Sequence, residues 1–251
     1  MLLESESAMN TKLEALKAFD TPTIANVVAT YPGKDYCLGL YHPWYGHWYT
    51  DQTLKCMYPE LGRTVGHVVT CTYGMPDPDG NSLKFADLLH VIAGIEGPVI
   101  VAVKQDFPED IVKINGLLGG NMMTAFKTAG VVGVLSDGPS RDVDEIRHLA
   151  MQYMITGTTA GHGKFSLRAI NTPVEVCGMQ VSPNDMIHMD ENGAVKFPAS
   201  YLDEVLEKAS YLAKIESLRQ ARMLETKDME CVIKIMNGVY DKELVEIKEA
   251  A

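Results

Sequence analysis

Two charged residues, Arg141 and Asp142, follow closely on the apolar run VVGVL at 131–135. The run predicts a buried strand, and in open α/β sheets the carboxyl ends of strands form the usual ligand crevice. An arginine offers a planar fork of donors to a carboxylate or ketone oxygen, and an aspartate offers oxygen to a hard divalent cation. A structural role fits equally well, in which Asp142 caps the following helix. Arg141 would then pair with Asp144 or Glu145.

Three glycines, Gly116, Gly119 and Gly120, precede a predicted helix upstream of this pair. The start of a helix has free backbone N–H groups and the positive end of the helix dipole, which together hold carboxylates or phosphates. A tight turn explains such a glycine-rich loop equally well. The sequence therefore leaves open whether these N–H groups bind an anion.

Histidines supply further candidates. His162 lies between two glycines, where its imidazole would be accessible for proton transfer or would simply face solvent. His188 and Asp190 share one face of a predicted strand, where they form a ligand pair or, as we expect, a polar edge. His42 and His47 flank two tryptophans at a spacing that fits no zinc motif, which favours aromatic packing.

The elements that must position these residues alternate between helix and strand. Helices are predicted over 11–18, from Thr21 as N-cap, and over 84–93, 121–128 and 143–151. Strands are predicted over 64–73, 98–103, 131–135, 154–156, 173–176 and 185–188. After Pro198, apolar residues recur every three or four positions, which predicts an amphipathic helix, and a second helix follows over 228–236. The order indicates an α/β fold.

Composition narrows the class of protein. The 251 residues are 46% hydrophobic and 22% charged, as in globular domains, and the net charge of −11 disfavours nucleic acid or an anionic membrane as partner. Five scattered cysteines without a CxxC pair are typical of reduced thiols. The sequence shows no signal peptide and no apolar run of membrane-spanning length. We therefore expect a cytoplasmic protein with no nucleic-acid or membrane partner.

The segment AGVVGVLSDGPSRDVDEIR at 129–147 resembles the signature of the RraA-like family, which includes the 4-hydroxy-4-methyl-2-oxoglutarate aldolases. GRTVGHVVTC at 62–71 is similar to that family's strand after its first loop. GTTAGHGKFS and PVEVCGMQVSPNDMIHMDENGAVKFP are similar to its closing strands. The resemblance implies a swivelling β/β/α fold over 1–200, a homotrimer or homohexamer, and a site at the subunit boundary. The aromatic-rich segment 36–58 would be an insertion, and 201–251 a C-terminal helical extension.

The resemblance also implies roles for individual residues. Asp142 would bind Mg²⁺ or Mn²⁺, Arg141 would contact a keto acid, and backbone N–H groups at the helix start would hold the substrate carboxylate. The predicted substrate-binding residues are Arg141, Gly119, Gly120, Asn121, Met122 and Met123. This chain departs from the aldolases at Gly120, where they carry an acidic residue. Asn121 can supply an oxygen ligand but cannot exchange a proton at neutral pH.

These observations predict a divalent-metal-dependent carbon–carbon lyase of aldolase or decarboxylase type, acting on a small 2-oxo or hydroxy acid. Its catalytic residues would be Arg141, Asp142 and His162. The missing acid at Gly120 supports a second hypothesis of metal-dependent enolate or enediol chemistry on a sugar-acid-like substrate by an isomerase, hydratase or hydrolase. In that case His162 replaces the acid. A third hypothesis is a non-catalytic protein-binding regulator, since the family's namesake acts by binding a ribonuclease.

Overall fold

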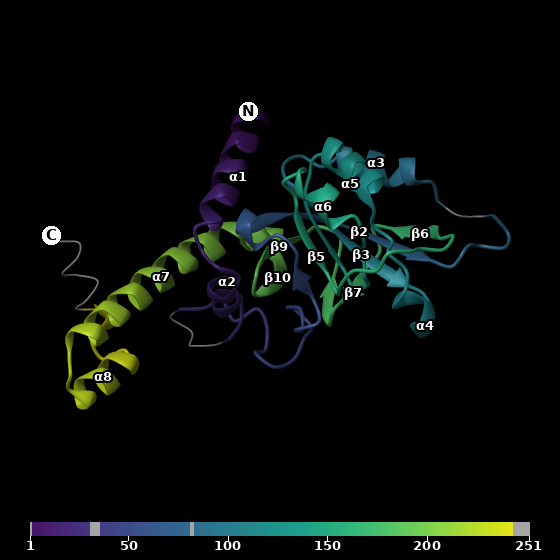
Figure 1. Ribbon diagram of the computed structural model, residues 1–251. Coiled ribbons are helices and arrows are strands. Elements are labelled where there is room, and N and C mark those ends of the chain that lie inside the picture. Colours follow the sequence, from purple (N-terminus) through teal and green to yellow (C-terminus); the bar gives the residue numbers. More distant parts are fainter. Residues whose placement is uncertain (1, 31–35, 81–82, 243–251) are drawn as a thin grey trace.

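Eight strands form one mixed sheet in a computed structural model that describes residues 2–30, 36–80 and 83–242 (Figure 1). The sheet order is β1-β5-β4-β3-β2-β9-β10, and β6 pairs with the carboxyl-terminal part of β2. The four central strands are parallel: β2 (Thr64–Gly74), β3 (Val99–Asp106), β4 (Val131–Ser136) and β5 (Gln152–Ile155). The outer strands are antiparallel to their neighbours: β1 (Lys55–Cys56), β6 (Ser166–Ile170), β9 (Asp185–Asp190) and β10 (Gly193–Pro198).

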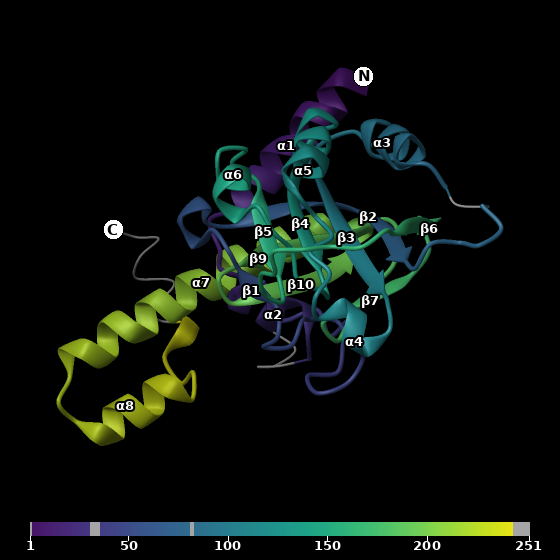
Figure 2. The same ribbon diagram turned by 45° about the vertical axis from the view of Figure 1, so that its right-hand side comes forward.

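Helices connect the parallel strands, because parallel neighbours need a crossover between them. One face of the sheet is covered by α3 (Phe85–Ala93), α5 (Gly120–Thr128) and α6 (Val143–Arg147), as Figure 2 shows. The short α4 (Glu109–Val112) follows β3. The opposite face is covered by a two-stranded ribbon, β7 (Val174–Val176) and β8 (Met179–Val181). The predicted α/β class is confirmed.

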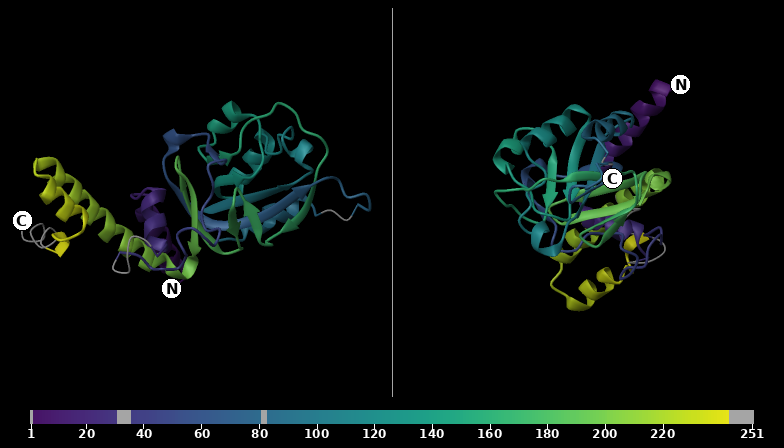
Figure 3. Two further views of the ribbon diagram at one scale, coloured as in Figure 1. Left: turned by 90° about the horizontal axis from the view of Figure 1, so that it is seen from below. Right: turned by 90° about the vertical axis from the view of Figure 1, so that its right-hand side faces the viewer.

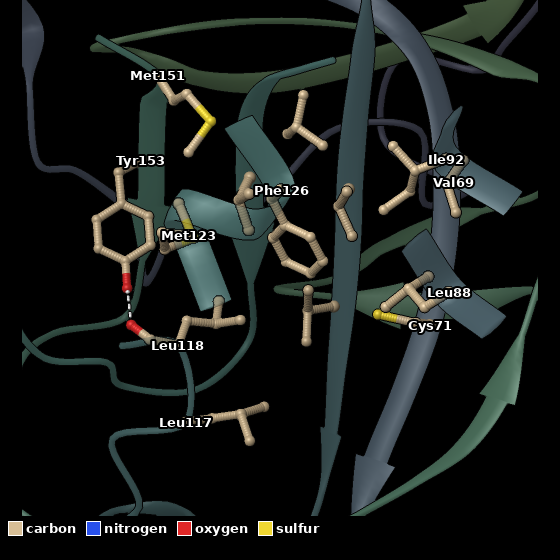
Figure 4. Close-up of a cluster of buried hydrophobic side chains, with 14 of the residues drawn as sticks. Val69, Cys71, Leu88, Ile92, Leu117, Leu118, Met123, Phe126, Met151 and Tyr153 are labelled. Carbon is tan, nitrogen blue, oxygen red and sulfur yellow. Dashed lines mark hydrogen bonds between the residues drawn. The ribbon is translucent and has the colours of Figure 1, made fainter. Parts of the chain in front are cut away.

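A continuous apolar core lies between the central strands and the helices above them. Phe126 and Met123 project from α5 toward the sheet, and Leu88 projects from α3 (Figure 4). All three side chains are fully buried. Truncating a buried aromatic residue of this kind typically costs about 3–5 kcal/mol of unfolding free energy. The core therefore fixes α5, whose first residues lie at the candidate site.

The terminal helices form a second layer against β9 and β10. α1 (Leu2–Leu16), α2 (Thr21–Val28) and α7 (Leu202–Glu225) share one apolar cluster with these strands. α7 then extends away from the sheet, and α8 (Met229–Met236) folds back against α7 (Figures 1 and 3). The last residues of the predicted C-terminal extension, 243–251, lie outside the described residues. None of the described helices is long and apolar enough to span a membrane.

The first part of the aromatic segment 36–58, up to Trp48, packs against the second layer, and its end joins the main sheet as β1. Trp48 is buried, stacks on Tyr41 with ring centroids 5.5 Å apart, and donates from Nε1 to the carbonyl of His42 at 2.9 Å. His47 bonds through Nδ1 to the carbonyl of Gly178 at 3.0 Å. The His42 ring stacks on Tyr45 with centroids 4.7 Å apart, so it takes part in aromatic packing as expected, whereas His47 is exposed and makes a hydrogen bond.

His188 and Asp190 do not form a polar edge, so that expectation was wrong. β9 lies between β2 and β10, and both side chains are completely buried beneath the start of α2. Asp190 accepts from the backbone N–H of Thr21 at 2.7 Å, and His188 Nδ1 lies 3.0 Å from the Thr21 hydroxyl. Thr21 is consequently not the N-cap of α2. Asp20 takes that role and accepts from the N–H of Thr23 at 2.8 Å.

His188 should make the unfolding free energy depend on pH. Burial lowers the pKa of its imidazole to about 4, outweighing the nearby Asp190 carboxylate. The unfolded chain, with a pKa near 6.5, binds the proton first, so stability present above pH 6.5 is lost as pH falls toward 4. Between pH 7.5 and pH 5 the expected loss is about 2 kcal/mol. Urea unfolding at both pH values measures it.

The matched variants are His188→Gln and His162→Gln. Replacing the buried imidazole should remove most of the pH dependence, and His162→Gln, which removes an exposed imidazole, is the control for the loss of a histidine in general. If His188→Gln retains the full wild-type dependence, other groups cause it.

Candidate active site

The loop after β4 is held against β3 by polar contacts. Gln105 donates from Nε2 to the carbonyl of Pro139 at 3.0 Å. Gly138 lies so close that a Cβ there would stand 2.3 Å from Gln105 Cδ, which requires glycine. Asp137 accepts from the Gln105 N–H at 2.7 Å and pairs with Lys104 at 2.5 Å. Burial raises the pKa of Asp137 despite these partners. Asp137 therefore anchors the loop rather than facing a ligand.

Ser140 ties the same loop to two others. The Tyr153 hydroxyl donates to the carbonyl of Leu118 at 2.7 Å (Figure 4). The Ser140 hydroxyl donates to that carbonyl as well and contacts the Tyr153 hydroxyl. On its other side, the Ser140 carbonyl accepts from the N–H of Thr159 at 2.9 Å. The loops after β4, before α5 and after β5 are thus joined at one buried point.

Arg141 and Asp142 emerge from this junction with side chains that are 34% and 30% exposed. Asp142 has a left-handed backbone (φ 58°), which few residues other than glycine adopt and which aspartate tolerates. Its Oδ2 accepts from the backbone N–H of Gly120 at 3.0 Å and lies 3.3 Å from Arg141 Nε. The Asp142 side chain makes no capping bond to α6. The structure therefore does not contain the alternative arrangement, in which Asp142 caps α6 and Arg141 pairs with Asp144 or Glu145.

The glycine-rich loop lies directly against this pair. A Cβ on Gly119 would stand 2.8 Å from Asp142 Oδ2 and 3.2 Å from Arg141 Nε. A Cβ on Gly116 would stand 2.9 Å from the carbonyl oxygen of Thr159. Gly116 requires glycine because backbone approaches it so closely, whereas a side chain at residue 119 would have to displace the Asp142 and Arg141 side chains. The glycines therefore bring the start of α5 within reach of the Asp142 carboxylate.

The backbone N–H groups over 120–123 were predicted to hold the substrate carboxylate, and only some of them are free of other hydrogen bonds. The N–H of Gly120 is bonded to Asp142, and the N–H of Met123 donates to the carbonyl of Gly119 at 3.1 Å. The N–H groups of Asn121 and Met122 have no hydrogen-bond partner in the described parts of the chain. Two donors at the positive end of α5 are thus free to hold a carboxylate.

The donor set at Asp142 suits a hard divalent cation that keeps most of its water. Its carboxylate is partly exposed, and its Oδ1 makes no hydrogen bond or ion pair with the described residues. Among residues 2–30, 36–80 and 83–242, no three His, Cys, Asp or Glu side chains gather into a closed metal cage. Mg²⁺ is commonly held by one or two carboxylates and several waters, so such a cage is not needed. Mg²⁺ or Mn²⁺ therefore fits Asp142.

His162 lies apart from the Arg141–Asp142 pair. Its loop is exposed, its Nδ1 lies 2.9 Å from the carbonyl of Gly163, and its ring lies 5.7 Å from that of Phe165. The backbone links the two regions, since the N–H of Gly116 donates to the carbonyl of Gly161 at 2.8 Å. In the described part of the chain, no hydrogen bond or ion pair joins His162 to Arg141 or Asp142. A catalytic role for His162 stays a prediction.

Comparison with known proteins identifies the family. Residues 43–196 match the RraA-like family model, described as Aldolase/RraA. The chain belongs to the RraA-like family. An uncharacterised protein of Methanocaldococcus jannaschii is 33% identical over 118 residues, which are 47% of this chain and 57% of the relative. The chain thus spans little more than half of that relative. A 4-hydroxy-4-methyl-2-oxoglutarate aldolase of Thermus thermophilus is 29% identical over 129 residues, 47% of this chain and 79% of the relative.

Solved structures confirm the fold. Streptomyces coelicolor RraAS2, titled an unusual member of the RNase ES inhibitor RraA protein family, superposes with a TM-score of 0.65. The match covers 84% of this chain and 98% of RraAS2 at 21% sequence identity. The RraA-like fold expected from the signature segment is therefore correct.

Proposed function

We propose that this RraA-like protein is a divalent-metal-dependent carbon–carbon lyase, of aldolase or decarboxylase type, that acts on a small 2-oxo or hydroxy acid. The observation that carries the proposal is the junction of Arg141, Asp142 and the start of α5. Asp142 adopts a left-handed backbone and bonds across to Gly120 instead of capping its own helix. Strained backbone at a pre-shaped polar junction is typical of functional sites.

Each residue of this junction would have a separate role in the proposed reaction. Asp142 would hold the cation, which supplies positive charge that polarises the ketone of the substrate. The guanidinium of Arg141, whose Nη2 lies 3.8 Å from the Cβ position of Gly119, would donate to the substrate and share the negative charge that develops on it. The free N–H groups of Asn121 and Met122 would orient the substrate carboxylate. An expected homotrimer or homohexamer remains a prediction that light scattering can test.

The direct test is to measure pyruvate release from oxaloacetate and from 4-hydroxy-4-methyl-2-oxoglutarate, with Mg²⁺ or Mn²⁺ and after chelation. Decarboxylation should fall at least about tenfold on chelation and return when metal is added. Aldol cleavage should be slower, because it needs a base for the hydroxyl proton in addition to the metal, and residue 120 is a glycine where the aldolases carry an acid. Rates with metal alone serve as the control. Activity unaffected by chelation, or absence of both activities, would contradict the proposal.

A non-catalytic role in binding another protein is the second candidate, and the α7–α8 hairpin favours it. The hairpin projects from the sheet (Figure 3). Large exposed apolar side chains on α7 and α8 include Tyr211, Leu224, Met229, Ile233 and Met236, and Val239 follows directly after α8. Exposed apolar surface of this kind often marks a contact with another chain. A protein that acts only by binding has no need of a metal, so the absence of Mn²⁺ binding by the wild-type chain would favour this candidate.

A further inference from the structure

Glu145 lies where a side chain at residue 120 would have to lie. A Cβ on Gly120 would stand 2.3 Å from Glu145 Oε1 and 2.7 Å from Oε2, so the carboxylate fills that space. Gly120 is in the first turn of α5 with helical backbone, which any residue can adopt. The Glu145 carboxylate, rather than the backbone, is therefore what occupies the room for a side chain here.

The Glu145 and Asp142 carboxylates face the same junction. Asp142 Oδ2 accepts from the N–H of Gly120, and Glu145 lies against the Cα of that residue. Asp142 is the N-cap residue of α6 and Glu145 lies in its first turn, and both side chains reach Gly120 from this end of the helix. Two acids from α6 thus meet the start of α5, which is the positive end of its dipole.

The Glu145 carboxylate has no polar partner in the part of the chain that the structure describes. Its side chain is exposed, and no hydrogen bond or ion pair joins it to another described residue. Its neighbour Arg147 pairs with Glu60, and Arg141 pairs with Asp142. Arg141 offsets the charge of Asp142, whereas no cationic side chain among the described residues pairs with Glu145. Oxygen from one or two carboxylates is what Mg²⁺ and Mn²⁺ take from proteins.

We infer that Glu145 is the second carboxylate of the divalent-cation site and binds the ion together with Asp142, directly or through a water molecule. The inference rests on the proposed function, in which Asp142 is the first ligand. Glycine at residue 120 then has a definite role, since it leaves the room that the Glu145 carboxylate needs. A side chain at residue 120 would displace that carboxylate from the cation.

The test is a titration of the full chain with Mn²⁺, in which the electron paramagnetic resonance signal of the free ion reports binding. Glu145→Gln should weaken Mn²⁺ affinity at least about tenfold, as loss of a metal-site partner typically does. Asp144→Asn is the matched control, because it removes the same charge from the adjacent position of α6. Its affinity should stay within about twofold of wild type.

Gly120→Ala provides a second and independent variant. The added Cβ only has to move the exposed end of Glu145, and alanine favours a helix, so the melting temperature should not fall. Mn²⁺ affinity should nevertheless fall, as it does in Glu145→Gln. Loss of binding without loss of stability distinguishes a ligand role from a structural one.

The outcomes separate the two proposals. Loss of Mn²⁺ binding in Asp142→Asn with unchanged affinity in Glu145→Gln or Gly120→Ala would overturn the role of Glu145 and leave the proposed function standing. A wild-type chain that binds no Mn²⁺ would overturn both. Equal losses in Glu145→Gln and Asp144→Asn would show a general effect of charge and would also overturn the inference.

Discussion

Asp142→Asn is expected to reduce metal-dependent decarboxylation of oxaloacetate to the rate of the metal alone, a loss on the order of 100-fold. Asparagine tolerates the left-handed backbone of residue 142 and can still accept from the N–H of Gly120, so the loop should keep its shape. The neutral amide, however, offers a divalent cation far weaker coordination than a carboxylate. Initial rates across a range of Mn²⁺ concentrations measure the effect.

Asp144→Asn is again the control for this change, since it alters charge on α6 away from the Gly119–Gly120 loop. Circular dichroism should give the same spectrum for Asp142→Asn and wild type. A rate close to wild type at saturating Mn²⁺ would mean that Asp142 only holds the loop together, and the proposed metal site would then be wrong.

Arg141→Gln is expected to lower kcat/KM for oxaloacetate by about 100- to 1000-fold while leaving Mn²⁺ affinity undiminished. Arg141 Nε lies 3.3 Å from Asp142 Oδ2, so its removal would free that oxygen from a partner and would not remove a metal ligand. The lost activity should therefore come from poorer orientation of the substrate and less shared charge. Steady-state kinetics and Mn²⁺ titration on the same preparation separate the two effects.

Arg147→Gln is the matched control for Arg141→Gln. Arg147 lies on α6, pairs with Glu60, and lies over the ring of Tyr58 at 4.7 Å, away from Asp142. Its replacement should leave kcat/KM within a few-fold of wild type. A parallel loss of Mn²⁺ affinity and activity in Arg141→Gln would instead assign the arginine to shaping the Asp142 loop.

The central strands could be predicted from sequence because burial on both faces gives them unbroken apolar runs. VVGVL and PVIVAV became β4 and β3 within one residue at their starts. β10 was not predicted from the local residue pattern, since GAVKFP begins with glycine and ends with proline, which are unfavourable in strands. Only the resemblance of 173–198 to the family's closing strands indicated it. It forms because it pairs with β9 along its whole length and buries Val195 and Phe197. Tertiary partners, rather than local preference, create such strands.

At the candidate site, sequence identified the residues but not their arrangement. The order of apolar run, Arg141 and Asp142 places the pair at the end of a strand, and the glycines mark a close approach of backbone. The left-handed conformation of Asp142 and its bond to Gly120 depend on loops that meet only in the fold. Glu145 was considered only as a partner for Arg141, because nothing local indicates that its carboxylate fills the space beside Gly120.

The most direct test of the account is a crystal structure of the protein soaked with Mn²⁺ and pyruvate, in which anomalous scattering locates the ion. We expect one peak within about 2.5 Å of an Asp142 carboxylate oxygen, at the junction with Gly119 and Gly120. The pyruvate carboxylate should lie at the N–H groups of Asn121 and Met122, with Arg141 beside it. A peak at another site, or no ion at Asp142 at millimolar Mn²⁺, would contradict the account.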